Sequence, residues 1–242
     1  MQLAYSSRGK DIHVDVVRPA TDEDRPAIVV LHGSGGARDF PRNVQELTAR
    51  GYVAVAPHYF ESTGTSWADP DSIRRHGLTW GHTVLEAVEF ARTLPNVDGQ
   101  AIGTLGFSLG AYLAVAAAAH DRRIKCLVEF FGGAPEKFLP SLDHLPPTLI
   151  LHGSDDIVVP VRHAMRLRQL CEENNFYYEM EIYHGAGHSF NEPLMQTAME
   201  RAISFLDRYL RTPQSEAVSY ERAMRSVLRP DRGYLATPGN DL

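Results

Sequence analysis

The chain has 242 residues, of which 43% are hydrophobic and 22% are charged, so a packed core is expected and wholesale disorder is excluded. This length suits one large α/β domain. The formal net charge of −6 argues against a nucleic-acid-binding scaffold, which would normally present a basic patch.

The sequence offers no candidate for a membrane span. No apolar run approaches the roughly 18 residues that a spanning helix needs. The longest candidate, residues 111–119, is broken by Tyr112 and followed by charged residues. Residues 1–6 have neither the basic start nor the apolar core of a signal peptide. We therefore expect a cytoplasmic protein with neither a membrane nor a nucleic acid as partner.

Strand-like and helix-like segments alternate along the chain, which is typical of a mainly parallel sheet with helices on both faces. Short β-branched or alternating runs predict strands at residues 12–17, 27–31, 52–56, 101–107, 126–131, 148–152 and 177–183. Apolar residues at helical spacing predict helices at about 39–50, 79–94, 109–120, 161–174 and 193–210.

Two long irregular segments, 58–78 and 132–147, interrupt this alternation. Loops of this length are usually lids or binding loops, and both segments follow the carboxyl end of a predicted strand, where open α/β sheets bind ligands. The first segment contains Phe60 and Trp67, which are candidates for contact with an apolar part of a small-molecule substrate.

The end of the chain is an addition to this pattern. We expect the α/β domain to span residues 1–211 and a C-terminal helical extension to span 212–242. Apolar side chains recur there at helical spacing, at Ala217, Tyr220, Met224 and Val227. Such an apolar stripe must pack against another apolar surface. We expect it to pack on the protein's own body, and the alternative is a homodimer formed through the extension.

Residues 106–110 read Gly-Phe-Ser-Leu-Gly and fit the G-x-S-x-G nucleophile elbow, with a buried strand before and a helix after. The elbow strains the serine backbone, and close packing leaves no room for side chains at the flanking positions, which explains the two glycines. Ser108 is therefore the candidate nucleophile, at the amino end of a helix. The alternative interpretation is a glycine-rich turn of a nucleotide-binding fold.

A serine hydroxyl needs a base, and enzymes with such an elbow place an acid and then a histidine after the serine. Asp155 and Asp156 follow the predicted strand 148–152, and both are candidates for the acid. His188 lies in a glycine-rich loop after the last predicted strand and is the candidate base. His184 lies four residues earlier, but the glycines between the two histidines favour a loop over a helical zinc pair. We expect neither a metal nor an organic cofactor.

The same chemistry needs N–H donors for the oxyanion of a tetrahedral intermediate. We expect one donor from the backbone of Leu109, directly after the nucleophile. The second should come from residues 32–36, with Ser34 as the first candidate and Gly35 as the second. The glycines of this loop let its backbone approach a substrate closely. A G-x-G-x-x-G pattern and a P-loop are both absent, so nucleotide binding is not expected.

With these motifs the chain resembles the α/β hydrolases and, among them, the dienelactone hydrolase family, over about residues 10–210. The resemblance rests on residues 32–36, the elbow 106–110, the turn 153–160 and residues 185–190. It implies a single domain with the α/β-hydrolase fold, and it selects Asp156 over Asp155 as the acid.

The enzymes that give this family its name use a cysteine nucleophile, whereas this chain has Ser108. The resemblance therefore implies a serine esterase or lactonase. Those enzymes also bind a substrate carboxylate with arginines, which makes Arg74 and Arg75 candidates for that role.

We expect a hydrolase that cleaves a carboxylic ester or lactone through an acyl-enzyme, with Ser108 as nucleophile, His188 as base and Asp156 as the group that orients the imidazole. One alternative is acyl transfer or cyclisation by the same nucleophile. Another is a non-catalytic ligand-binding protein, since fold alone does not fix function. Peptide cleavage is less expected, because the chain lacks the extra domain of oligopeptidases with this fold.

Overall fold

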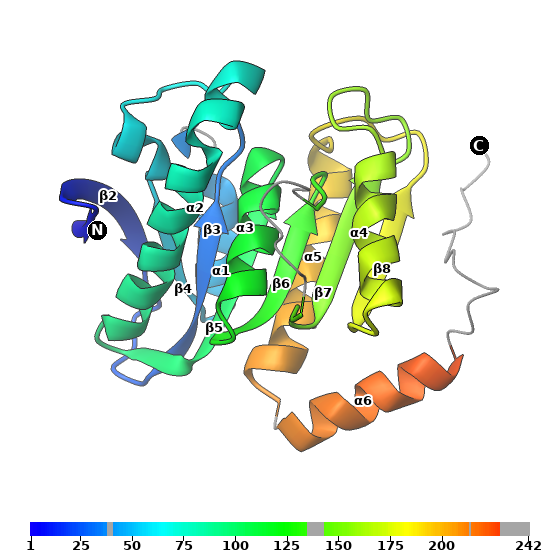
Figure 1. Ribbon diagram of the computed structural model, residues 1–242. Coiled ribbons are helices and arrows are strands. Elements are labelled where there is room, and N and C mark those ends of the chain that lie inside the picture. The colour runs from blue at the N-terminus through cyan, green and yellow to red at the C-terminus, as the bar shows by residue number, and fades with distance from the viewer. Residues whose placement is uncertain (38–40, 135–142, 213, 228–242) are drawn as a thin grey trace.

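The computed structural model describes residues 1–37, 41–134, 143–212 and 214–227. An eight-stranded sheet forms its centre, in the order β1-β2-β4-β3-β5-β6-β7-β8 (Figure 1). β2 pairs antiparallel with both β1 and β4, and the other neighbours pair in parallel. The mainly parallel α/β sheet predicted from the sequence is confirmed.

The strands are β1 (Gln2–Ser7), β2 (Lys10–Val17), β3 (Arg25–Leu31), β4 (Val53–Pro57), β5 (Val97–Phe107), β6 (Ile124–Phe130), β7 (Thr148–Gly153) and β8 (Tyr178–Tyr183). The helices are α1 (Pro41–Ala49), α2 (Pro70–Thr93), α3 (Leu109–His120), α4 (Arg162–Glu173), α5 (Glu192–Leu210), α6 (Gln214–Val227) and the short 3-10 helix η2 (Tyr59–Thr63).

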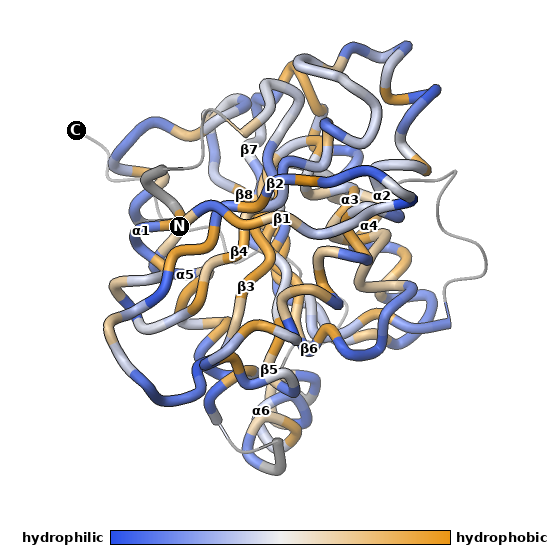
Figure 2. Tube along the Cα trace, turned by 90° about the vertical axis from the view of Figure 1, so that its left-hand side faces the viewer, coloured by the Kyte–Doolittle hydropathy of each residue, from blue (hydrophilic) through white to orange (hydrophobic). Residues whose placement is uncertain are grey.

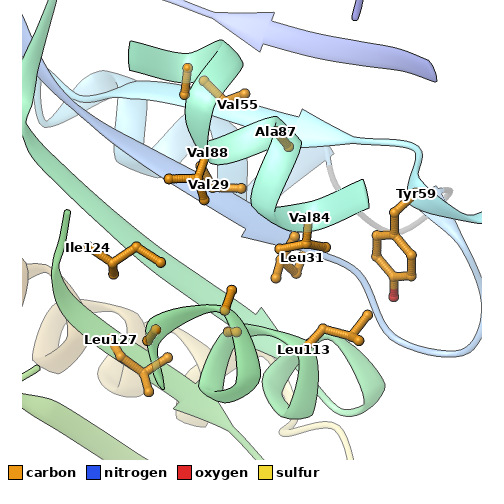
Figure 3. Close-up of a cluster of buried hydrophobic side chains, with 14 of the residues drawn as sticks. Val29, Leu31, Val55, Tyr59, Val84, Ala87, Val88, Leu113, Ile124 and Leu127 are labelled. Atoms are coloured by element: carbon orange, nitrogen blue, oxygen red, sulfur yellow. The ribbon is translucent and has the colours of Figure 1, made fainter. Parts of the chain in front are cut away.

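Two apolar clusters fill the two faces of the sheet. On one face, Val29 and Leu31 of β3 pack against Val84 of α2 and Leu113 of α3 (Figure 3), and α4 extends this layer. On the other face, α1 and α5 cover side chains that include Val30. Because β3 and its parallel neighbours are buried on both sides, their sequences are continuous apolar runs. Figure 2 shows the hydrophobic colour following these central strands.

The edge strand β1 was not predicted from the sequence. It forms a hairpin with β2 through Arg8 and Gly9, whose φ values of 50° and 81° suit a tight hairpin turn. Tyr5 is buried in β1, and its hydroxyl donates to the Thr83 carbonyl of α2 at 2.9 Å. The strand lacks a run of β-branched residues, and this explains why its sequence carries only a weak signal.

The prediction that 58–78 is irregular was wrong. The segment holds η2 and the first turns of α2. Asp69 caps α2 by accepting the Ser72 N–H at 2.7 Å, and Pro70 occupies the first turn. This Asp-Pro signal precedes the apolar stripe by several residues, so a prediction based on hydrophobic spacing begins the helix too late. Of the second long segment, residues 135–142 lie outside the described residues.

The stripe of α6 packs on the protein's own body. Ala217 is buried, and Tyr220 and Met224 pack against the cluster under α5. The Arg208 guanidinium of α5 lies 3.8 Å from the Tyr220 ring centroid, and Glu179 of β8 accepts a hydrogen bond from the same guanidinium at 2.5 Å. Residues 213 and 228–242 and the Val227 side chain lie outside the described residues, so the extent of the extension stays a prediction.

Figure 1 shows α6 at the end of the sheet opposite the carboxyl ends of its parallel strands. Among the residues that the structure describes, no helix combines the length and the apolar character needed to cross a bilayer.

We expect Tyr220→Ala to release α6, because the change removes the ring under Arg208, a contact worth about 1 kcal/mol. Hydrogen exchange in α6, measured by mass spectrometry, should accelerate while exchange in the central strands stays unchanged. Val218→Ala is the matched control on the same helix, since Val218 is 39% exposed. Equal exchange in the two variants would contradict this docking.

Candidate active site

Ser108 lies between β5 and α3 with φ 53° and ψ −118°, a strained conformation for a residue with a side chain. A methyl group on Gly106 would overlap the Gly110 carbonyl, and one on Gly110 would overlap the carbonyls of Leu31 and His32. Both positions therefore require glycine, as the sequence interpretation held. The strain and the crowding place the Ser108 side chain at the amino end of α3.

The structure brings together the three residues expected to form the catalytic group. His188 Nε2 lies 3.0 Å from Ser108 Oγ, and His188 Nδ1 lies 2.7 Å from Asp156 Oδ2. Nδ1–H donates to the carboxylate, so Nε2 is free to accept the hydroxyl proton. The Asp156 side chain is fully buried, and that of His188 is 16% exposed. This arrangement can activate a serine hydroxyl toward a carbonyl carbon.

Asp156 also holds its own turn. Its Oδ1 accepts the backbone N–H groups of Val158 and Val159 at 2.9 and 2.8 Å. The carboxylate of Asp155 is instead exposed and accepts the Ser154 hydroxyl at 2.6 Å. The carboxylate that contacts His188 is therefore also the one that holds this turn.

His152, which the sequence interpretation did not select, lies beside this carboxylate. Its Nε2–H donates to the Val159 carbonyl at 2.8 Å, and the same nitrogen lies 3.4 Å from Asp156 Oδ2. Burial lowers the pKa of the His152 imidazole, so the ring stays neutral beside the acid. A histidine at the end of a buried strand carries no sequence signal of such a contact.

Phe131 is a second missed residue. The sequence predicts a strand to residue 131, but β6 ends at Phe130 and Phe131 adopts a positive φ of 42°. Its N–H donates to the Leu151 carbonyl at 2.8 Å, and its ring meets the His188 imidazole edge-on at 4.9 Å. The two glycines that follow signal a turn and mark where the strand ends.

The loop of residues 32–36 lies against the nucleophile. A methyl group on Gly33 would lie 3.3 Å from Ser108 Cβ and 3.9 Å from Oγ. The Ser34 carbonyl accepts the Ala68 N–H at 3.0 Å, and this bond ties the loop to the segment after η2. Leu109 is the first residue of α3, where backbone N–H groups have no partner within the helix. Leu109 follows Ser108 directly, and Ser34 follows the Gly33 that lies against Ser108. The identity of the oxyanion donors, with Gly35 among the candidates, stays a prediction.

An aromatic stack supports the 32–36 loop. The His32 ring stacks on Tyr59 at 4.0 Å, and the Tyr59 hydroxyl donates to the His32 carbonyl at 2.7 Å. Burial lowers the pKa of His32 to about 4, so the ring is neutral at neutral pH. Phe60 meets the same ring edge-on and is only 4% exposed. Its side chain therefore packs beneath the loop.

The other candidates for substrate contact lie on the surface. Trp67 is 65% exposed. Arg74 and Arg75 are exposed on the first turns of α2, where Arg74 forms an ion pair with Asp71. His184, just past the end of β8, is also exposed. A role in substrate binding stays a prediction for Phe60, Trp67 and the two arginines.

The chain is similar to proteins of a known family. The dienelactone hydrolase family model matches residues 12–214. A carboxymethylenebutenolidase of Rhodococcus opacus is 28% identical over 207 residues, which cover 76% of this chain and 81% of that protein.

Two solved structures share the fold. A Klebsiella pneumoniae protein provisionally named a dienelactone hydrolase superposes with a TM-score of 0.74 at 20% identity, covering 86% of this chain and 98% of the other. The acylaminoacyl peptidase of Pyrococcus horikoshii superposes with a TM-score of 0.74 at 17% identity, covering 88% of this chain and 42% of the peptidase. The chain belongs to the dienelactone hydrolase family, has the α/β-hydrolase fold, and is a hydrolase of carboxylic esters or lactones.

Proposed function

We propose that the chain cleaves its ester or lactone substrate through an acyl-enzyme on Ser108. The observation that carries this proposal is the continuous hydrogen-bonded line from Ser108 Oγ through the imidazole of His188 to Asp156. The family supports ester or lactone hydrolysis as the overall reaction. The line of hydrogen bonds supports a reaction route in which a serine is the nucleophile.

In the first half of the reaction, Ser108 Oγ attacks the carbonyl carbon while His188 Nε2 takes the hydroxyl proton. The tetrahedral intermediate collapses, the bond to the leaving oxygen breaks, and Nε2–H returns the proton to that oxygen. In the second half, water attacks the Ser108 ester in the same way, and the acid product leaves. Asp156 keeps Nδ1–H oriented and stabilises the imidazolium that forms in each half.

The oxyanion of each intermediate needs two donors. We assign the N–H of Leu109 as the first and the N–H of Ser34 as the second, with Gly35 as the alternative to Ser34. The contact of Gly33 with Ser108 supports this assignment, because it sets the loop backbone beside the attacking oxygen. Such a donor is worth on the order of 3 kcal/mol in the transition state.

Two exposed apolar side chains are next in sequence to residues of the proposed site. Trp67 precedes Ala68, which holds the 32–36 loop, and Ile157 follows Asp156 with 91% of its surface exposed. We propose that these two side chains contact the apolar part of a small-molecule ester or lactone. Arg74 and Arg75 are the cationic side chains assigned to any carboxylate that the substrate carries.

Ser108→Ala should abolish hydrolysis of p-nitrophenyl acetate and leave the fold intact, because it removes only the attacking oxygen. A fluorophosphonate should add once to the wild type and not to Ser108→Ala, as read by intact mass. Ser66→Ala is the control, since Ser66 is exposed near the 32–36 loop, and it should label like the wild type. Substantial hydrolysis by folded Ser108→Ala would overturn the assignment of the nucleophile.

Tyr59→Phe removes the hydroxyl that holds the His32 carbonyl and leaves the aromatic stack in place. We expect kcat to fall about threefold to tenfold with little change in KM, since one such hydrogen bond is worth about 1 kcal/mol. Steady-state kinetics measures both constants.

Tyr5→Phe is the matched control, because it removes another buried hydrogen bond from a tyrosine hydroxyl, to the Thr83 carbonyl at the far edge of the sheet. Its kcat should stay at the wild-type value. An unchanged kcat in Tyr59→Phe, or equal losses in both variants, would contradict a specific role of Tyr59 in holding the loop.

A further inference from the structure

Glu129 is a buried carboxyl that the proposed mechanism does not use. It lies near the end of β6, in register with Gly106 of the elbow, and has no exposed surface. Its Oε2 accepts the Gly132 N–H at 2.8 Å. Its Oε1 is buried and has no hydrogen-bond partner among the described residues. Burial of a carboxyl without full hydrogen bonding costs folding free energy, so a role for Glu129 must be sought.

The surroundings of Glu129 favour its neutral form. Burial raises the pKa of Glu129 to about 8, although the Gly132 N–H acts in the opposite direction. Among the residues that the structure describes, Glu129 interacts electrostatically with two titratable groups, Tyr112 of α3 and Cys171 of α4. Burial raises the pKa of both, so both are neutral at neutral pH. Glu129 therefore keeps its proton at neutral pH.

Glu129 holds a turn that touches the two reacting residues. Residues 130–132 form this turn (the 130–132 turn). The Phe130 carbonyl accepts the Ser108 N–H at 2.9 Å, and a methyl group on Gly132 would lie 3.1 Å from the Ser108 carbonyl oxygen. On its other side, Phe131 packs against the His188 ring. The positive φ of Phe131 means that this turn needs outside bonds to persist.

We propose that Glu129 is a positioning residue of this hydrolase: its carboxyl holds the 130–132 turn, and the turn fixes the backbone of Ser108 and the ring of His188. This inference rests on the proposed function, because it assigns Ser108 and His188 their roles. Glu129 touches neither residue's reacting atoms, so its effect passes through Gly132 and Phe131.

Ionisation of Glu129 should loosen the turn. A carboxylate at this site would leave a charged Oε1 without a partner, so water must enter or the side chain must move. Linkage determines how the ionisation of Glu129 changes the stability of the fold with pH. The folded pKa lies above the ordinary value of 4.5, so the stabilising contribution of this group is complete below that value. It is lost progressively as pH rises through the folded pKa of about 8.

The first test measures stability against pH in Glu129→Gln, which keeps an acceptor for Gly132 and cannot ionise. The melting temperature of this variant minus that of the wild type should rise between about pH 5 and about pH 8. Glu181→Gln on β8 is the control, since Glu181 is half-buried and lies 3.7 Å from the Arg201 guanidinium. It should show no such rise. A difference for Glu129→Gln that does not change with pH would overturn the buried neutral carboxyl.

The second test measures kcat and KM on p-nitrophenyl acetate against pH. Wild-type kcat should fall on the alkaline side with a midpoint at about pH 8, and Glu129→Gln should lack this fall. Glu129→Leu removes the acceptor for Gly132, so at neutral pH its kcat should drop at least about tenfold with KM nearly unchanged. Fluorophosphonate labelling of Glu129→Leu should slow in proportion.

The outcomes separate the two proposals. A folded wild type that is not labelled by the fluorophosphonate would overturn the proposed function, and the role of Glu129 would fall with it. If the fluorophosphonate labels the wild type but the kcat of Glu129→Gln still falls at alkaline pH, only the positioning role of Glu129 is overturned. Wild-type kcat and labelling rate in folded Glu129→Leu would also overturn that role. If Glu129→Leu does not fold, the pH profile of Glu129→Gln decides.

Discussion

The close contact of α3 with the ends of β3 and β5 is the constraint on which the rest of the site depends. The backbone at Gly106 and Gly110 touches carbonyl groups so tightly that no side chain fits at either position. This contact forces the positive φ of Ser108, and it also brings the 32–36 loop beside the hydroxyl, because the loop continues from β3. One packing interaction thus sets both the conformation of Ser108 and the position of the 32–36 loop.

Three loops near Ser108 are held by buried polar contacts. Tyr59 and the Ala68 N–H hold the 32–36 loop, Asp156 holds its own turn through two backbone N–H groups, and Glu129 holds the 130–132 turn. Loops that carry catalytic groups need such anchors, since their backbone polar groups would otherwise be satisfied by water and move. In the proposed mechanism, contacts to the backbone of these loops therefore position the reacting atoms.

The sequence predicts the parts of this site that local motifs encode. The elbow, its two glycines and the order of Ser108, Asp156 and His188 all follow from short patterns, as do the central strands. The anchors do not, because they join residues distant in the chain: Tyr59 is 27 positions from His32, and β6 reaches the elbow only by strand pairing. The start of α2 was missed for a different reason, since its first turns are exposed and show no apolar stripe.

The two carboxyls near Ser108 differ in how many donors they meet, and this difference gives them separate tasks. Asp156 accepts two backbone N–H groups and the imidazole N–H, enough to compensate a charge in a buried place. Glu129 accepts a single N–H, so burial keeps its proton in place. Among the described residues, the carboxyl that contacts His188 is that of Asp156, at Nδ1. In the proposed mechanism, a second negative charge near Ser108 would oppose the oxyanion. A neutral Glu129 can hold its turn without this cost.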